Sequence, residues 1–287
     1  MTATPQPASV PSPAHDLIPQ RSPRASSVVA FWALLARDLT VTRRNLREVL
    51  PRTLLQPLLL VFVFTYVFPK IGQGVGGATG DASGSFSTLL VAGVIALAIL
   101  FQGIQSVALP MVQEFGYTRE IEDRVLAPLP VALVAFEKII AGAIISFGSA
   151  VLVFPIAAFV PATPVNLEID WVVLITLMPL ACVMAGALGL MFGTQFEPRN
   201  VPILFGVVVL PITFLGAIYY SWSALEPIRW LQLFVLVNPL VYMSEGFRAA
   251  LTPSTHMSLW VIYGALVGFT SLFTWLGIRG FKRRVVT

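Results

Sequence analysis

The stretch STLLVAGVIALAILFQGIQSVALPMV, residues 87–112, contains no charged side chain. A helix needs roughly 20 mostly apolar residues to cross a bilayer, and this stretch is long enough to do so. Further charge-free stretches of about that length cover residues 53–69, 139–163, 171–196, 200–225 and 254–278. We therefore predict an all-α integral membrane protein with six transmembrane helices.

The composition excludes a soluble globular protein. Of the 287 residues, 56% are hydrophobic and only 11% are charged, whereas soluble domains carry about 25% charged residues. Several of the apolar stretches contain prolines, among them Pro155, Pro179 and Pro211. Neighbouring helices in a membrane can satisfy the carbonyls that a proline frees, so we interpret these prolines as kinks and not as helix ends.

The distribution of basic residues predicts the orientation. If the amino terminus is cytoplasmic and the chain crosses six times, 15 of the 18 Lys and Arg residues fall on the cytoplasmic side. Positive charge in short loops is retained on that side. We therefore predict that both termini are cytoplasmic.

The amino-terminal region divides into two parts. Residues 1–27 contain six prolines and five serines, a composition typical of a disordered tail. Residues 28–50 instead repeat apolar side chains at steps of three and four, which predicts an amphipathic helix. Its arginines can hold it at the cytoplasmic membrane surface, each contributing about 1 kcal/mol near anionic lipid. The residues expected at this interface are Trp32, Arg37, Arg43, Arg44 and Arg47. Simple anchoring and a mechanical role both remain open.

A second feature is the charged segment QEFGYTREIEDRVLAPLP, residues 113–130, which separates two charge-free stretches. Thr118 can cap a short helix that carries Glu120 and Glu122 in its first turn, and Pro128 prevents its continuation. An exposed helix between two membrane spans can transmit the push of a partner protein to both spans. A merely solvated loop is the alternative interpretation.

Residues 226–252 are too apolar for an ordinary external loop and too interrupted by prolines for a full span. We predict a short re-entrant helical hairpin in the outer leaflet, between the fifth and sixth spans, at the outer end of a pathway. Glu245 and Arg248 lie three residues apart and can pair on one helical face. A purely structural pair and a pair that touches substrate are both possible.

The sequence has no catalytic signature. It lacks a phosphate-binding loop, a nucleophile elbow and a zinc-binding histidine pair, and its single cysteine, Cys182, lies inside a predicted span. We therefore predict that the chain is not an enzyme and binds no metal or cofactor. A transport-like body without an energy source of its own indicates a partner that supplies the energy.

The order of these segments resembles the membrane subunit of type-2 ATP-binding cassette (ABC) exporters, over about residues 28–284. Within that family the chain is most similar to the branch of daunorubicin-resistance and nodulation-factor export permeases. The most specific marks are the charged loop that ends at Ala127 and Pro128 and a constellation near the carboxyl terminus. That constellation consists of Asn238, Pro239, Tyr242, Glu245 and Arg248.

The resemblance implies a half-transporter in the plasma (inner) membrane of a bacterium. Two membrane subunits, identical or related, would join two cytosolic ATPase subunits that bind ATP and Mg²⁺. Residues 114–126 would form the coupling helix that docks on the ATPase, and residues 28–50 the interfacial helix beside it. The coupling residues would be Glu114, Thr118, Arg119, Glu120, Glu122, Asp123 and Arg124, and the constellation in residues 226–252 would form an outer gate. The chain departs from the commonest loop pattern because Tyr117 separates Gly116 from Thr118.

The function that follows is export of an amphipathic or lipid-linked substrate of the drug, glycolipid, polyketide or polysaccharide class, driven by ATP, as in multidrug resistance. An ion-gradient-driven secondary transporter is the alternative, and a membrane-embedded transferase is a third. No feature indicates nucleic-acid binding.

Overall fold

The computed structural model describes residues 23–71, 81–116, 129–161, 165–196, 203 and 205–286. Within these ranges the chain is helical and contains no strand. Among the described residues, five helices are long and apolar enough to cross a membrane, one fewer than the sequence predicts. They cover Leu46–Val67, Phe86–Gly116, Val131–Phe159, Trp171–Gln195 and Leu259–Val285.

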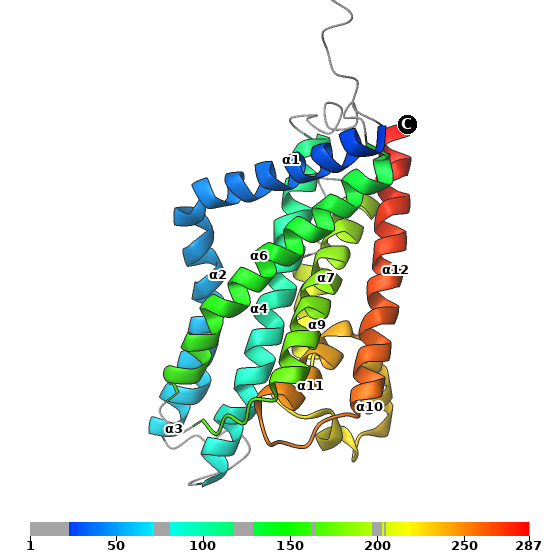
Figure 1. The fold of residues 1–287 in the computed structure, drawn as a ribbon. Coiled ribbons are helices and arrows are strands. Elements are labelled where there is room, and N and C mark those ends of the chain that lie inside the picture. The colour runs from blue at the N-terminus through cyan, green and yellow to red at the C-terminus, as the bar shows by residue number, and fades with distance from the viewer. Residues whose placement is uncertain are drawn as a thin grey trace, which may run out of the picture.

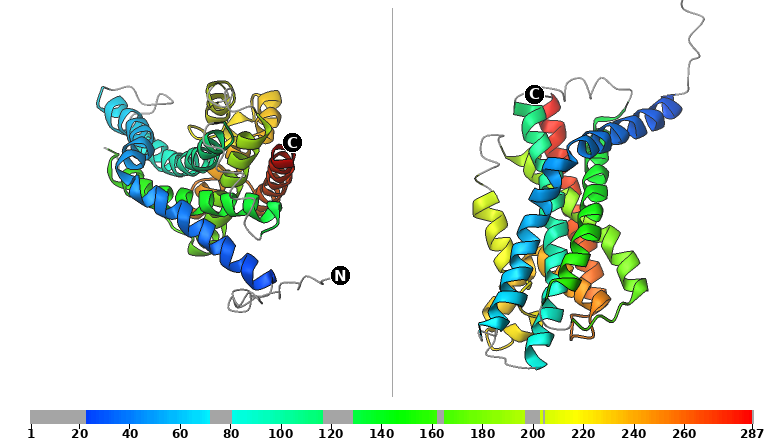
Figure 2. Two further views of the ribbon diagram at one scale, coloured as in Figure 1. Left: turned by 90° about the horizontal axis from the view of Figure 1, so that it is seen from above. Right: turned by 90° about the vertical axis from the view of Figure 1, so that its left-hand side faces the viewer.

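The long helices form a bundle that α1 (Pro23–Arg44) crosses at one end, here called the α1 end (Figure 1). Helix α11 (Pro239–Leu251) lies toward the opposite end, here called the α11 end. The last helix, α12 (Leu259–Val286), finishes at the α1 end. The two views in Figure 2 confirm that α1 lies across the bundle and not along it. The beginning of α1 and the end of α12 therefore share one end of the molecule.

The predicted interfacial helix, residues 28–50, is shorter than expected and begins earlier. Helix α1 starts at Pro23, inside the segment expected to be a tail, since proline suits the first turn of a helix. It ends at Arg44, and Asn45 has a non-helical backbone, with φ −97° and ψ 16°. Helix α2 (Leu46–Val61) then turns along the bundle and continues through η1 (Phe62–Val67) into α3 (Phe68–Lys70). Residues 46–50 therefore belong to the first membrane-crossing helix.

Helix α4 (Asp81–Gly116) is the centre of the bundle and packs most extensively on α7 (Trp171–Gln195) and α6 (Val131–Phe159). Small residues permit this close packing. A Cβ atom added at Gly189 of α7 would lie 2.7 Å from the carbonyl oxygen of Gly103 in α4. Such a contact is too short for any larger side chain, which is the usual role of small residues between membrane helices.

Two of the prolines interpreted as kinks lie within continuous helices, as predicted. Pro155 is inside α6 and Pro179 is inside α7. Neither proline ends its helix.

The predicted fifth span, residues 200–225, is not one continuous helix in its described part, so the prediction of six continuous transmembrane helices is not confirmed. Its described part forms η3 (Phe205–Val209) and α9 (Leu210–Phe214), and helical structure then stops until η4 (Trp222–Leu225). Ala217 has a φ of 53°, a left-handed conformation that no α-helix can contain. Since α7 ends at the α1 end and α12 begins at the α11 end, the chain returns between them through the segment that contains η3 and α9.

The predicted hairpin consists of α10 (Arg229–Phe234), η5 (Val235–Val237) and α11. Its two arms differ. Almost every side chain of α11 is buried against α4, α7 and α12, whereas α10 exposes Trp230 and Leu233. Helix α11 is therefore a buried part of the bundle.

Candidate functional site

Polar side chains of α11 bind the backbone where the fifth segment breaks. After α9 the chain leaves the helical conformation, so several carbonyl groups lose their intrahelical donors. The Asn238 side-chain amide donates to the Ile212 carbonyl oxygen at 2.7 Å. The Ser244 hydroxyl donates to the Gly216 carbonyl oxygen at 2.8 Å. Because a buried carbonyl without a donor costs free energy, these bonds stabilise the break.

Arg248 completes this network and is itself fully buried, with a side chain that is 0% exposed. Its Nη2 atom donates to the carbonyl oxygens of Ala217, at 2.6 Å, and Tyr220, at 3.1 Å. Its Nη1 atom donates to Oε1 of Glu245 at 2.5 Å, which confirms the predicted pair. The guanidinium group thus binds both the left-handed residue and the turn that follows it.

Glu245 accepts hydrogen bonds from two backbone amides besides Arg248. The Trp222 amide donates to Oε1 at 2.8 Å, and the Met257 amide donates to Oε2 at 2.9 Å. These amides begin η4 and precede α12, so one carboxylate joins three segments that are distant in the sequence. A buried charge is tolerated only with such partners.

The other contacts of the predicted outer gate lie at the start of α11. Asn238 caps α11, since its Oδ1 accepts from the Leu240 amide at 3.0 Å, and Pro239 occupies the first turn. The Tyr242 hydroxyl donates to the Leu236 carbonyl oxygen at 3.0 Å. The five residues of the constellation and Ser244 are here called the α11 network. Their contacts described here all lie within the chain.

A second buried group of charges, here called the Lys138 cluster, lies at the α1 end. The Nζ atom of Lys138 in α6 lies 2.6 Å from Oδ2 of Asp38 in α1 and 2.7 Å from Oε1 of Glu114 in α4. The side chains of Lys138, Asp38 and Glu114 are 4%, 15% and 8% exposed. The cluster therefore ties α1 to the end of α4 and to the beginning of α6.

Most of the predicted coupling helix lies outside the described residues. Of residues 114–126, only Glu114 to Gly116 are described, and they form the end of α4. Thr118, Arg119, Glu120, Glu122, Asp123 and Arg124 fall in the undescribed residues 117–128. Glu114, predicted as part of a docking surface, is instead buried and bound to Lys138. The Lys138 cluster therefore contacts both α4, which ends before residues 117–128, and α6, which begins after them.

The residues expected at the membrane interface divide between two helices. Trp32 is 62% exposed on α1, and Arg43 and Arg44 are exposed at its end. Arg47 belongs to α2. Arg37 lines a pocket beside Asp38. Leu35, another apolar residue of this helix, is buried, so the apolar side chains of α1 lie partly against the bundle and partly exposed.

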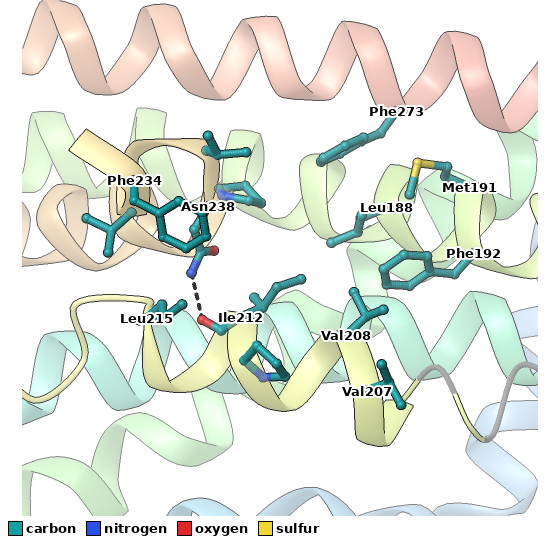
Figure 3. Close-up of a pocket in the computed structure, with 14 residues that line it drawn as sticks. Leu188, Met191, Phe192, Val207, Val208, Ile212, Leu215, Phe234, Asn238 and Phe273 are labelled. Atoms are coloured by element: carbon teal, nitrogen blue, oxygen red, sulfur yellow. Dashed lines mark hydrogen bonds between the residues drawn. The ribbon is translucent and has the colours of Figure 1, made fainter. Parts of the chain in front are cut away.

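An apolar cavity of about 430 Å³ lies between α7, the η3–α9 segment, α10 with η5, and α12 (Figure 3). Leu188, Phe192, Ile212 and Phe273 are among its lining side chains. Asn238 also reaches it, but its amide nitrogen is bound to the Ile212 carbonyl (Figure 3). The cavity suits an apolar chain and provides no group for acid–base chemistry. Across the described ranges, no cluster of three His, Cys, Asp or Glu side chains could hold a metal ion.

Sequence reasoning missed three residues of these sites. No sequence motif assigns a role to Asp38 or Ser244, and Lys138 enters the prediction only as one of the 15 basic residues on the cytoplasmic side. A signal for Lys138 exists, because it lies at the border of a charge-free stretch, where a charged side chain near the membrane needs a partner. Its partners Asp38 and Glu114 lie 100 and 24 residues away in the sequence, so no local pattern could identify them.

Comparison with known proteins identifies the family. The family model for the ABC-2 type transporter matches residues 29–252. The chain is also 29% identical over 194 residues to the inner membrane transport permease YadH of Escherichia coli strain K12, covering 66% of this chain and 72% of that protein. The YadH protein of Shigella flexneri matches to the same extent. The fold, the apolar helices and these matches together show that this chain is a multi-pass plasma-membrane protein that belongs to the ABC-2 type transporter family.

Proposed function

We propose that this chain is the membrane subunit of an ATP-driven exporter and that the Lys138 cluster couples it to a cytosolic ATPase. The observation that carries the proposal is the position of the cluster. It fastens α1 to α4 and α6, the two helices that flank residues 117–128. A force applied to that segment or to α1 therefore reaches two membrane helices at once.

The chemistry of the cluster suits the transmission of movement. Its hydrogen bonds join charged groups, and such bonds are shorter and stronger than hydrogen bonds between neutral groups. Two partners on Lys138 restrict the relative movement of three helices. Residues 118–124 would supply the charged docking surface, and ATP and Mg²⁺ would bind to the partner. Two ATPase copies and a second permease subunit, identical or related, would complete the transporter.

In this proposal the α1 end is cytoplasmic, as the positive charges predict. The segment of η3 and α9 then returns across the membrane as a sixth, interrupted passage. The α11 network holds the outer side of that passage. The apolar cavity beside it supports an amphipathic or lipid-linked substrate, as expected for the daunorubicin-resistance and nodulation-factor branch.

The test replaces Glu120, Glu122, Asp123 and Arg124 together with alanine in the full chain. We expect normal membrane insertion but at least a tenfold loss of co-purified ATPase subunit and of ATPase activity. An Arg279→Ala variant is the control, because Arg279 is exposed on α12. Undiminished co-purification and ATPase activity in the fourfold variant would refute the proposal.

An ion-gradient-driven secondary transporter is the second candidate. The observation that favours it is the Lys138 cluster itself, since buried ionisable groups mark proton and ion pathways. The test is uptake of a fluorescent amphiphilic dye by proteoliposomes that contain only this chain. Uptake driven by a pH gradient and abolished by a protonophore would establish the second candidate. Transport that needs the ATPase subunit and ATP would exclude it.

A further inference from the structure

A polar groove under α1 starts at the Lys138 cluster and extends beyond it along α4. Its wider part consists of two overlapping pockets of about 240 and 230 Å³, which share Thr42, Ser106 and Gln113. A narrow extension of about 20 Å³ shares Thr53, Gln102 and Gln105 with the second pocket and reaches Leu97. From Gln113 to Leu97 the groove follows α4 for about 24 Å, at 1.5 Å per residue.

One face of α4 gives the groove its polarity. Gln102, Gln105, Ser106 and Gln113 recur at helical spacing inside a helix that otherwise reads as a membrane span. An amide group at membrane depth is costly unless it makes hydrogen bonds, so any amide of this face without a protein partner favours a bound ligand.

Some of these amides have hydrogen-bonding capacity to spare. The Thr53 hydroxyl donates to Oε1 of Gln102 at 2.8 Å and thereby joins α2 to α4. In the described part of the chain, the side-chain nitrogen of Gln102 and the whole amide of Gln105 make no hydrogen bond. Since an amide both donates and accepts, it matches a hydroxyl group, which does the same.

The charges of the groove leave no net attraction for an ion. Its charged lining residues are two basic and two acidic side chains at the α1 end, namely Arg37, Lys138, Asp38 and Glu114. Lys138 is bound to both carboxylates. A charged head group would lose its hydration without gaining a counter-charge. A neutral head group avoids that cost.

Besides these polar groups and the amides of Asn45 and Gln56, the groove is lined by apolar side chains. They include Leu97 and Phe101 in the narrow part and Leu109 and Ile145 in the wider part. An aliphatic chain can contact these side chains while a polar head group binds the amides. The groove therefore has the two kinds of surface that an amphiphile needs.

We infer that this groove binds the head group of a neutral, hydroxyl-bearing amphiphile, of the glycolipid or alkyl glycoside class. This inference rests on the proposed function as a permease and narrows its substrate class. Glutamine and hydroxyl side chains of α4 and α2 bind the hydroxyl groups, and the head group lies between α1 and the middle of α4.

The test uses three photoreactive amphiphiles with the same alkyl chain and different head groups: a glucoside, a trimethylammonium and a sulfate. The full chain in lipid nanodiscs is labelled with each, and the sites are mapped by mass spectrometry. We expect the glucoside probe to label α2 and α4 around Thr53 and Gln102 at least fivefold more than the trimethylammonium or the sulfate probe does. Excess unlabelled alkyl glucoside should compete.

Two variants give the test its specificity. Gln102→Leu together with Gln105→Leu should reduce glucoside labelling at least fivefold, whereas Gln195→Leu on α7 should not. If the double variant does not fold, Gln105→Glu serves instead, and it should shift the preference from the glucoside to the trimethylammonium probe.

Equal labelling by all three probes, labelling confined to the apolar cavity, or unchanged labelling in the variants would overturn the inference. The assay needs no ATPase. A failure of the proposed function would appear as undiminished co-purification and ATPase activity in the fourfold variant, and it would leave this result unaffected.

Discussion

The two ends of the bundle both bury an ion pair, but they surround it differently. In the α11 network, Arg248 and Glu245 are neighbours on one helix, are 0% and 1% exposed, and bind backbone groups on several sides. In the Lys138 cluster the charges come from three helices, and Asp38 retains 15% exposure beside a partly open pocket. The first arrangement fixes an irregular backbone, whereas the second joins regular helices to one another.

The difference suggests that the two ends have different mechanical roles. A sealed network within a small region can change only if that region unfolds. A cluster between three helices, next to a polar groove, can adjust when the helices move. We therefore expect the α11 network to matter most for folding and the Lys138 cluster to matter most for coupling.

The largest effect is expected for Arg248→Ala. It leaves the buried Glu245 carboxylate without its counter-charge and two carbonyl groups without a donor, which should cost about 3–5 kcal/mol. The measurement is the free energy of unfolding in mixed micelles. The control is Arg279→Ala, which removes an exposed arginine beside Trp275 and should change little. An unfolding free energy close to that of the unaltered chain would contradict the sealed network.

A smaller loss of stability is expected for Lys138→Met. Water from the adjacent pocket can reach Asp38 and Glu114 after the lysine is lost, so the cost should be about 2–3 kcal/mol. The ATPase activity of the assembled complex should fall at least tenfold in the same variant. Lys282→Met provides the control, because Lys282 is exposed near the same end.

The comparison would fail if Lys138→Met destabilised the chain as much as Arg248→Ala while leaving ATPase activity intact. Adding Glu114→Gln to Lys138→Met should recover part of the stability, since it removes one of the two uncompensated carboxylates. No recovery would mean that the cluster is not an electrostatic unit.

The smallest effect is expected for Thr53→Val at the α1 end. It removes the hydrogen bond from Thr53 to Gln102 with little change of shape, and should cost about 0.5–1.5 kcal/mol. Thr40→Val is the matched control, because the Thr40 hydroxyl bonds only within its own exposed helix turn, to the Ala36 carbonyl. Equal unfolding free energies for the two variants would show that α2 is not held to α4 by this bond.

The long helices could be predicted because their signal is local. A charge-free run such as residues 87–112 must be helical in a bilayer, since no water is present to satisfy an exposed backbone. The pairing of Glu245 with Arg248 was also predictable, because residues three apart on a helix share a face. The family follows from motifs of the same local kind.

The break in the fifth segment could not be predicted from residues 200–225, which are as apolar as the intact spans. The donors that permit it are Asn238, which caps α11, and Ser244 and Arg248 within α11, and each lies 26 to 31 residues after the carbonyl that it binds. The division of residues 28–50 between α1 and α2 likewise depends on how both helices pack on the bundle.

The sequence by itself determined the membrane environment, the helical class and the family, because hydrophobicity and helical spacing are properties of consecutive residues. Only the tertiary structure decided which polar groups meet. Asp38, Glu114 and Lys138 are three separate charges in the sequence, and they form one cluster because α1, α4 and α6 converge at one end. The same convergence turns scattered glutamines into a groove, since a surface between helices exists only once the helices have packed.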